Sequence, residues 1–93
     1  MTTVNIAERT RILLRSSVLN IDSFWQQNIE EMICNNEAVL ALEFISDWIV
    51  EKDLQISSNI LDELEFLLGH FNSNRNIDYI RSNSLVTKCD NSN

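Results

Sequence analysis

The sequence predicts an all-α protein, a compact bundle of four main helices with room for one short C-terminal helix. The chain has 93 residues, no proline and a single glycine, so it almost lacks the residues that tight turns and β-hairpins need. Apolar residues instead recur at helical spacing in four successive segments. A chain of this length forms one domain, which we expect to cover residues 1–86, followed by a polar tail at 87–93.

Residues 4–18 and the segment that ends near Cys34 predict the first two helices. Small or apolar residues share one side of the first helix: Ile6, Thr10, Leu13, Leu14 and Ser17. Asn20 or Asp22 is expected to cap the second helix, because a short polar side chain can accept hydrogen bonds from the first unpaired backbone N–H groups. The second helix is expected to turn four residues toward the core: Trp25, Ile29, Met32 and Ile33.

The third predicted helix covers residues 37–52, and Asn35 or Asn36 is expected to cap it. The apolar residues of its predicted buried stripe are Ala38, Ala41, Leu42, Ile45, Trp48 and Ile49. A short connection follows this helix. Leu54 and Ile56 are expected to anchor that connection by inserting into the core.

The fourth predicted helix has the clearest periodicity and begins after a cap at Ser57 or Ser58. Its apolar stripe consists of Ile60, Leu61, Leu64, Leu67, Leu68 and Phe71. Gly69 lies where it could help to end this helix. The sequence then becomes rich in Asn and Ser, and residues 77–80 support at most one short further helix.

Reactive and metal-binding side chains are too few for an enzyme site or a bound cofactor. His70 is the only histidine, and Cys34 and Cys89 lack the spacing of a zinc site. The single glycine also excludes a glycine-rich phosphate loop. We therefore expect no enzymatic activity and no cofactor, and both cysteines are expected to be free thiols in a reducing compartment.

Hydropathy along the chain predicts a cytoplasmic protein. The longest uninterrupted apolar run, residues 38–42, is far shorter than the roughly 20 residues of a membrane-spanning helix. Residues 1–17 carry three arginines around a short apolar run and lack the longer apolar stretch of a secretory signal. Neither membrane insertion nor export is expected.

Acidic residues are concentrated in the middle of the chain. Between residues 30 and 65, ten acidic residues accompany the single basic residue Lys52, whereas both ends are nearly neutral and the whole chain has a net charge of −7. The electrostatic field of these acidic residues repels phosphate backbones and attracts cationic surfaces. The charge therefore predicts no direct binding to nucleic acid and favours a basic protein partner, with an ordinary solvated surface as the alternative.

A row of carboxylates on the third helix is the first candidate binding surface. Glu43, Asp47 and Glu51 are spaced four residues apart, so they stack along one face of the helix, opposite its apolar stripe. Like charges at this spacing cost roughly 0.2–0.5 kcal/mol per pair, so local stability does not explain the row. A cationic partner does.

An aromatic residue on the fourth helix is the second candidate. Phe66 lies off the apolar stripe, beside Asp62 and Glu65, and an aromatic anchor within an acidic rim is typical of interface hot spots. Packing beneath the C-terminal segment is the alternative for Phe66. If the third and fourth helices are antiparallel, both candidate groups can face one side of the molecule.

Residues 37–57, followed by the helix that includes Ile60-Leu-Asp-Glu-Leu, resemble the small Maf-type immunity proteins of bacteria. The positions that carry the likeness are Ala41, Glu43, Asp47, Glu51 and Ile56. Related immunity proteins accompany contact-dependent growth inhibition toxins, whose delivered domains are often nucleases. The resemblance implies that the partner is a toxin domain, a nuclease and in particular a ribonuclease. Because a nuclease holds phosphates in a basic cleft, the acidic charge of this chain predicts that it occludes the active site, with binding beside the site as the alternative.

Two other functions are compatible with the sequence. A helical adaptor or chaperone-like module would also present a charged helical surface to a protein. Asp22-Ser23-Phe24, at the start of an acidic helix, resembles the Asp-Ser-Leu motif in which acyl carrier proteins attach phosphopantetheine to the serine. Ser23 comes only a short link after the first helix, however, and an N-cap role explains Asp22 without any chemistry.

Overall fold

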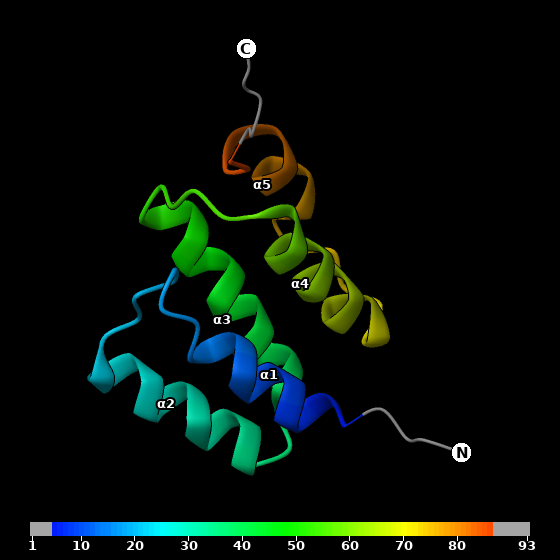
Figure 1. The fold of residues 1–93 in the computed structure, drawn as a ribbon. Helices are drawn as coiled ribbons and strands as arrows, with labels where there is room; N and C mark the ends of the chain where they lie inside the picture. The colour runs from blue at the N-terminus through cyan, green and yellow to red at the C-terminus, as the bar shows by residue number, and fades with distance from the viewer. Residues whose placement is uncertain (1–4, 87–93) are drawn as a thin grey trace.

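The computed structural model describes residues 5–86, which form five α-helices (Figure 1). Their bounds are α1 (Ile6–Leu14), α2 (Ser23–Cys34), α3 (Ala38–Glu51), α4 (Ser58–His70) and α5 (Ile77–Asn83). The prediction of an all-α bundle with four main helices and one short C-terminal helix is therefore confirmed. Residues 1–4 and the polar tail predicted at 87–93 lie outside the described residues.

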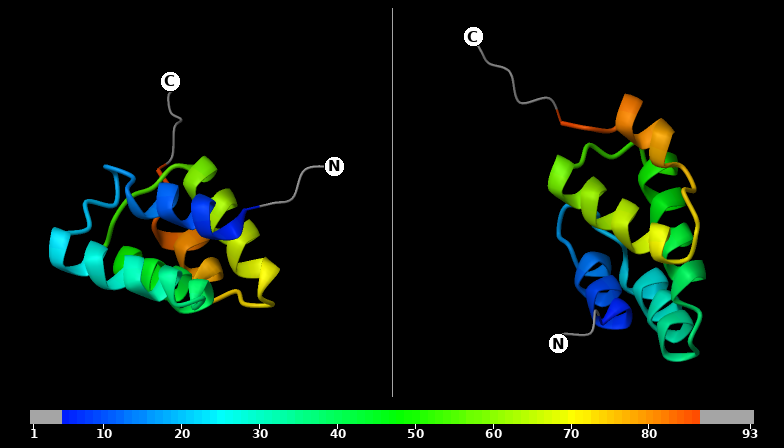
Figure 2. Two further views of the ribbon diagram at one scale, coloured as in Figure 1. Left: turned by 90° about the horizontal axis from the view of Figure 1, so that it is seen from below. Right: turned by 90° about the vertical axis from the view of Figure 1, so that its right-hand side faces the viewer.

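Helix α3 is the centre of the bundle and packs against each of the other four helices. In Figure 2, α1 and α2 lie at one end of α3 and α5 lies at the other. The core consists almost entirely of Leu and Ile side chains. The buried residues of α3 and α4 follow the predicted stripes closely: Ala41, Leu42, Ile45 and Ile49, with Leu61, Leu64, Leu67 and Leu68.

Helix α1 is shorter than its periodicity predicts, ending at Leu14 rather than near residue 18. The following loop turns inward and buries Leu19 and Ile21 in the core, while Ser17 and Val18 are exposed. The loop after α1 therefore contributes two side chains to the core, which the periodicity of the segment did not predict.

The left-handed residues that end the helices are Asn and Asp, with no glycine among them. Asn36, Asp53 and Asn72 have φ values of 66°, 53° and 60°. Each follows a helix in the same pattern: the N–H two residues beyond the helix cap bonds to a carbonyl five residues earlier, as in Ser73 to Leu68 at 3.0 Å. The expectation that Gly69 ends α4 is wrong, because the helix continues through Gly69 to His70.

The helix starts confirm two predicted caps and correct a third. Asp22 accepts a hydrogen bond from the Trp25 N–H at 2.9 Å, and Ser57 accepts one from the Ile60 N–H at 3.3 Å. Helix α3 begins after Glu37 without a side-chain cap. Asn36 cannot serve as that cap because it already closes α2 in the left-handed conformation, within a link of only three residues.

The α3–α4 connection is tied to the chain that follows α5. Ile56 is fully buried, as predicted, whereas Leu54 is only partly buried. The Ile56 N–H donates to the Ser84 carbonyl at 2.8 Å, and the Val86 N–H donates to the Ile56 carbonyl at 2.9 Å. This short parallel bridge holds the end of α5 against the core.

Candidate functional site

Arginines from both ends of the chain bind carboxylates from its middle. The pairs are Arg9–Glu63, Arg11–Glu30, Arg15–Glu30, Arg75–Asp47 and Arg81–Glu65. The oppositely charged parts of the sequence therefore meet in the fold, where α1, α5 and the α4–α5 link lie against the acidic middle. Part of the negative charge that favoured a cationic partner is neutralised within the fold.

The predicted carboxylate row of α3 holds the link between α4 and α5. Asp47 accepts hydrogen bonds from Arg75 and from the Asn76 side chain, the latter at 2.7 Å, and Glu43 accepts one from the Ser73 hydroxyl at 2.9 Å. Both side chains are partly buried. The expectation of an open row is wrong for these two residues, because the cation that explains Asp47 belongs to the same chain. Glu51 is exposed.

Titration of Asp47 reflects this environment. Partial burial opposes ionisation of the carboxyl, but the hydrogen bonds from Arg75 and Asn76 outweigh it and lower the pKa of Asp47 below its ordinary value. The carboxylate is therefore held in its charged form. Its role in the folded chain is to position the link rather than to donate or accept a proton near neutral pH.

The three predicted site residues of α4 contact different neighbours. Glu65 pairs with Arg81 of α5 at 2.7 Å, and Asp62 is exposed. Phe66 has 49% of its surface exposed, and the Arg9 guanidinium carbon of α1 lies 4.6 Å from its ring centroid. Arg75 of the α4–α5 link binds Asp47 and Arg81 of α5 binds Glu65, so these two predicted site residues are each paired within the chain.

The outer surface of α2 and α3 carries an aromatic face that the sequence analysis did not predict. Phe24, with 63% of its surface exposed, stacks edge-on against Trp25 at 5.0 Å between ring centroids, and Trp25 lies 4.9 Å from Phe44. Trp25 and Trp48, both expected in the core, are only partly buried. We call Phe24, Trp25, Phe44 and Trp48 the aromatic face.

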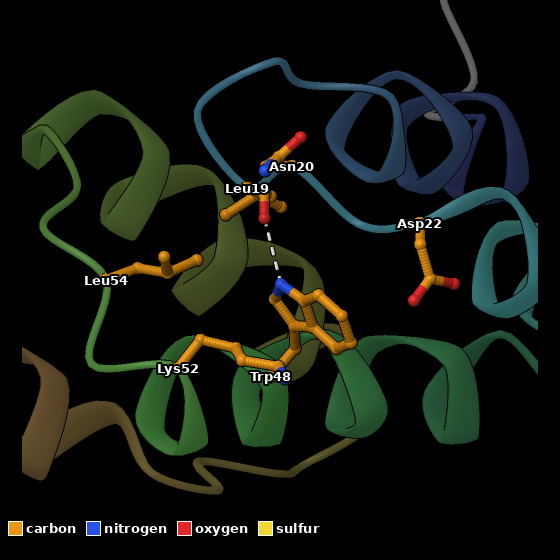
Figure 3. A pocket seen from close by; sticks show the side chains of 6 residues that line it. All are labelled: Leu19, Asn20, Asp22, Trp48, Lys52 and Leu54. Carbon is orange, nitrogen blue, oxygen red and sulfur yellow. Dashed lines mark hydrogen bonds between the residues drawn. The ribbon is translucent and has the colours of Figure 1, made fainter.

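Two adjacent hollows open on this face. The larger, of about 330 Å³, is lined by Trp25, Phe44, Asp47, Trp48, Glu51 and Lys52. The second hollow, of about 260 Å³, is also lined by Trp48 and Lys52 (Figure 3). Its other lining residues are Leu19, Asn20 and Asp22 between α1 and α2, and Leu54 after α3. The Trp48 indole N–H donates to the Leu19 carbonyl at 2.8 Å and fixes the ring, while the Lys52 ammonium lies 4.9 Å from the ring centroid.

The signal for the aromatic face was present but ambiguous in the sequence. Phe44 lies one position outside the predicted stripe of α3, and Phe24 is adjacent to Trp25. A stripe assignment places the edge of a buried surface only to within a residue or so, because the packing of the neighbouring helix decides what is covered. An aromatic side chain at that edge can be either core or surface.

The remaining chemistry of the described residues is sparse. No group of three or more His, Cys, Asp or Glu side chains within residues 5–86 is arranged to hold a metal ion. Cys34 is an exposed free thiol, and Cys89 lies outside the described residues. None of the five helices is long and apolar enough to cross a membrane.

Comparisons with family models, with curated proteins and with solved structures found no match. The resemblance of residues 37–57 to Maf-type immunity proteins therefore stays a prediction from the sequence. The aromatic face, its hollows and the exposed carboxylates beside them are surface features of the described residues that a partner can contact.

Proposed function

We propose that this chain is a cytoplasmic immunity protein that performs no chemistry and neutralises a toxin domain by binding it. The observation that carries the proposal is the aromatic face on α2 and α3, where Phe24 exposes most of its surface to solvent. Aromatic side chains are enriched in the cores of protein interfaces, and Phe24 keeps 63% of its surface exposed despite its edge-on contact with Trp25. The resemblance on α3 supports the choice of a toxin as the partner.

Charge supports a basic partner. The chain keeps a net charge of −7 after its arginines have formed their ion pairs, since internal pairing leaves the total unchanged. Exposed carboxylates without an ion pair among the described residues include Glu31, Glu37, Glu51, Asp53 and Asp62. A nuclease domain binds phosphates through a basic cleft, and an acidic inhibitor can associate with it rapidly and occlude it.

Co-expression with the neighbouring toxin tests the proposal. The proposal requires a reading frame for a toxin immediately upstream of this gene, and cells that express the C-terminal domain of that toxin should survive only when this chain is present. The two purified proteins should form a complex that abolishes the nuclease activity. If the folded chain neither protects cells nor binds that domain, the proposal is wrong, and an adaptor function becomes the better explanation.

The carrier-protein alternative has a separate test. Ser23 is the first residue of α2 and is exposed, so it could be modified. Asp22 caps that helix through the Trp25 N–H, which gives it a structural reason to be there. The intact mass of the chain purified from bacteria should match the sequence, and an increment of one phosphopantetheine would identify a carrier protein instead.

A further inference from the structure

We propose that the larger hollow on the aromatic face accepts an arginine side chain of the protein partner. This inference rests on the proposed function only in requiring that the partner is a protein. It names the surface that binds and the chemistry that it recognises. The hollow is lined by Trp25, Phe44, Asp47, Trp48, Glu51 and Lys52.

The walls of the hollow have the chemistry that a guanidinium group requires. Three of its six lining residues are aromatic, and Trp25 and Phe44 are in contact at 4.9 Å with their planes inclined by 36°. Guanidinium is planar and weakly hydrated, so it stacks on aromatic rings and donates hydrogen bonds in its plane at the same time. The Lys52 ammonium already lies 4.9 Å from the Trp48 ring centroid, so this wall is shown to hold a cation.

Glu51 is the carboxylate at this hollow that remains for a partner. Asp47 also lines it, but its charge is met by Arg75 and Asn76 of the α4–α5 link. Glu51 is exposed and has no ion pair among the described residues. A cation that enters the hollow would meet its aromatic walls and this carboxylate, whereas an apolar side chain would desolvate Glu51 without compensation.

The hollow is large enough for one side chain of a partner. Its volume of about 330 Å³ is near the low end of the roughly 300–1,000 Å³ that small-molecule sites span. Arginine suits the aromatic walls of the hollow better than lysine does, because the lysine ammonium is compact, strongly hydrated and unable to stack. The chemistry of the walls therefore selects an arginine.

The chain contains its own reporter for this hollow. Its two tryptophans, Trp25 and Trp48, both line the hollow. Intrinsic fluorescence of the full chain should therefore change saturably when N-acetyl-arginine methylamide is added. The uncharged isostere N-acetyl-citrulline methylamide should produce no saturable change, and the lysine analogue should bind more weakly. Equal responses to the arginine and citrulline compounds, or no saturable response to either, would overturn the proposal.

Two adjacent substitutions should shift this affinity in opposite directions. Glu51→Gln should weaken binding of the arginine compound by about two- to fivefold, the effect of one exposed charge interaction. Lys52→Gln should strengthen binding by a similar factor, because it removes the cation that competes for the Trp48 ring. Glu37→Gln is the matched control: it removes an exposed carboxylate from the start of α3, outside the hollow, and should leave the affinity unchanged.

The toxin domain separates failure of this inference from failure of the proposed function. If the toxin domain binds and Glu51→Gln accelerates dissociation more than Glu37→Gln does, both stand. If the toxin domain binds with equal dissociation rates for these two variants, the partner docks elsewhere and the hollow proposal is wrong. If no toxin binds while the arginine compound does, the cation site stands and the immunity function is wrong.

Discussion

The Arg75 guanidinium binds both oxygens of the Asp47 carboxylate, with Nε–Oδ1 and Nη2–Oδ2 distances of 2.9 and 3.2 Å. This two-pronged contact joins the α4–α5 link to the centre of α3, and the Asn76 amide adds a third bond to the same carboxylate at 2.7 Å. In the right-hand view of Figure 2 the link runs alongside α3. The Asp47 carboxylate is therefore a main anchor of the link on α3, together with the hydrogen bond from Ser73 to Glu43.

Replacing Asp47 with Ala should lower the free energy of unfolding by about 1 kcal/mol and loosen the link. An exposed ion pair contributes roughly 0–1 kcal/mol, and the additional hydrogen bond from Asn76 raises this toward the upper end. Urea unfolding measures the loss, and amide hydrogen exchange at residues 73–81 should speed up. Glu51→Ala is the control on the same helix and should leave both measurements unchanged. A double-mutant cycle with Arg75→Ala that gives no coupling would contradict the assignment.

Protonation of Asp47 should account for part of the decrease in the free energy of unfolding at acidic pH. Because the pKa of this carboxyl is lower in the folded chain than in the unfolded one, the group stabilises the fold at pH values above its unfolded pKa, about 3.9. The contribution is lost as pH falls through the lower folded pKa. The stability difference between the wild type and Asp47→Asn should therefore be largest at neutral pH and shrink below about pH 4. A difference that is constant from pH 7 to pH 2 would show that the charge of Asp47 is not responsible.

Gly69→Ala should raise the free energy of unfolding by roughly 0.5–1 kcal/mol. Gly69 lies within α4 with a helical backbone, and an added Cβ would meet nothing within 4 Å. Alanine has the higher helix propensity and a less flexible unfolded chain. Thermal unfolding monitored by circular dichroism measures the gain. A loss of stability would mean that Gly69 is needed in a left-handed conformation after all.

Asn72, unlike Gly69, lies where a β-branched side chain should lower the free energy of unfolding. Its φ of 60° places it in the left-handed region, which glycine adopts without strain and β-branched residues disfavour. Asn72→Gly should preserve or slightly increase stability, whereas Asn72→Val should cost about 1–2 kcal/mol. Asn74→Val in the same link serves as a control, since Asn74 is exposed and has no positive φ. Equal costs for the two valine variants would contradict the role of Asn72.

Trp48→Phe should destabilise the fold by about 1 kcal/mol or more, although it keeps an aromatic ring. The substitution removes the indole N–H and leaves the Leu19 carbonyl without its donor. Trp48→Ala should cost more, but less than the roughly 3–5 kcal/mol for a fully buried tryptophan, because this ring is only partly buried. Phe24→Ala, on the same face but largely exposed, should leave stability unchanged in the same urea titration.

Local signals in the sequence determined the fold class and most of the helices. Apolar periodicity identified the buried stripes of α3 and α4, and the caps at Asp22 and Ser57 form the hydrogen bonds expected of them. These signals act within one or two helical turns, so they do not depend on what the rest of the chain does. Where two local roles competed for one residue, the prediction was wrong: Asn36 closes α2 in the left-handed conformation and does not also cap α3.

Only the tertiary structure decided which residues form surfaces and which carboxylates are occupied. Asp47 and Arg75 are 28 residues apart, and no local pattern indicates that the link after α4 returns along α3 to join them. The same holds for Trp48, whose partial exposure depends on where the α1–α2 loop places the Leu19 carbonyl. The spacing of residues along one helix defines its faces. The path of the connecting segments decides what covers each face, and the pattern within a single helix does not indicate that path.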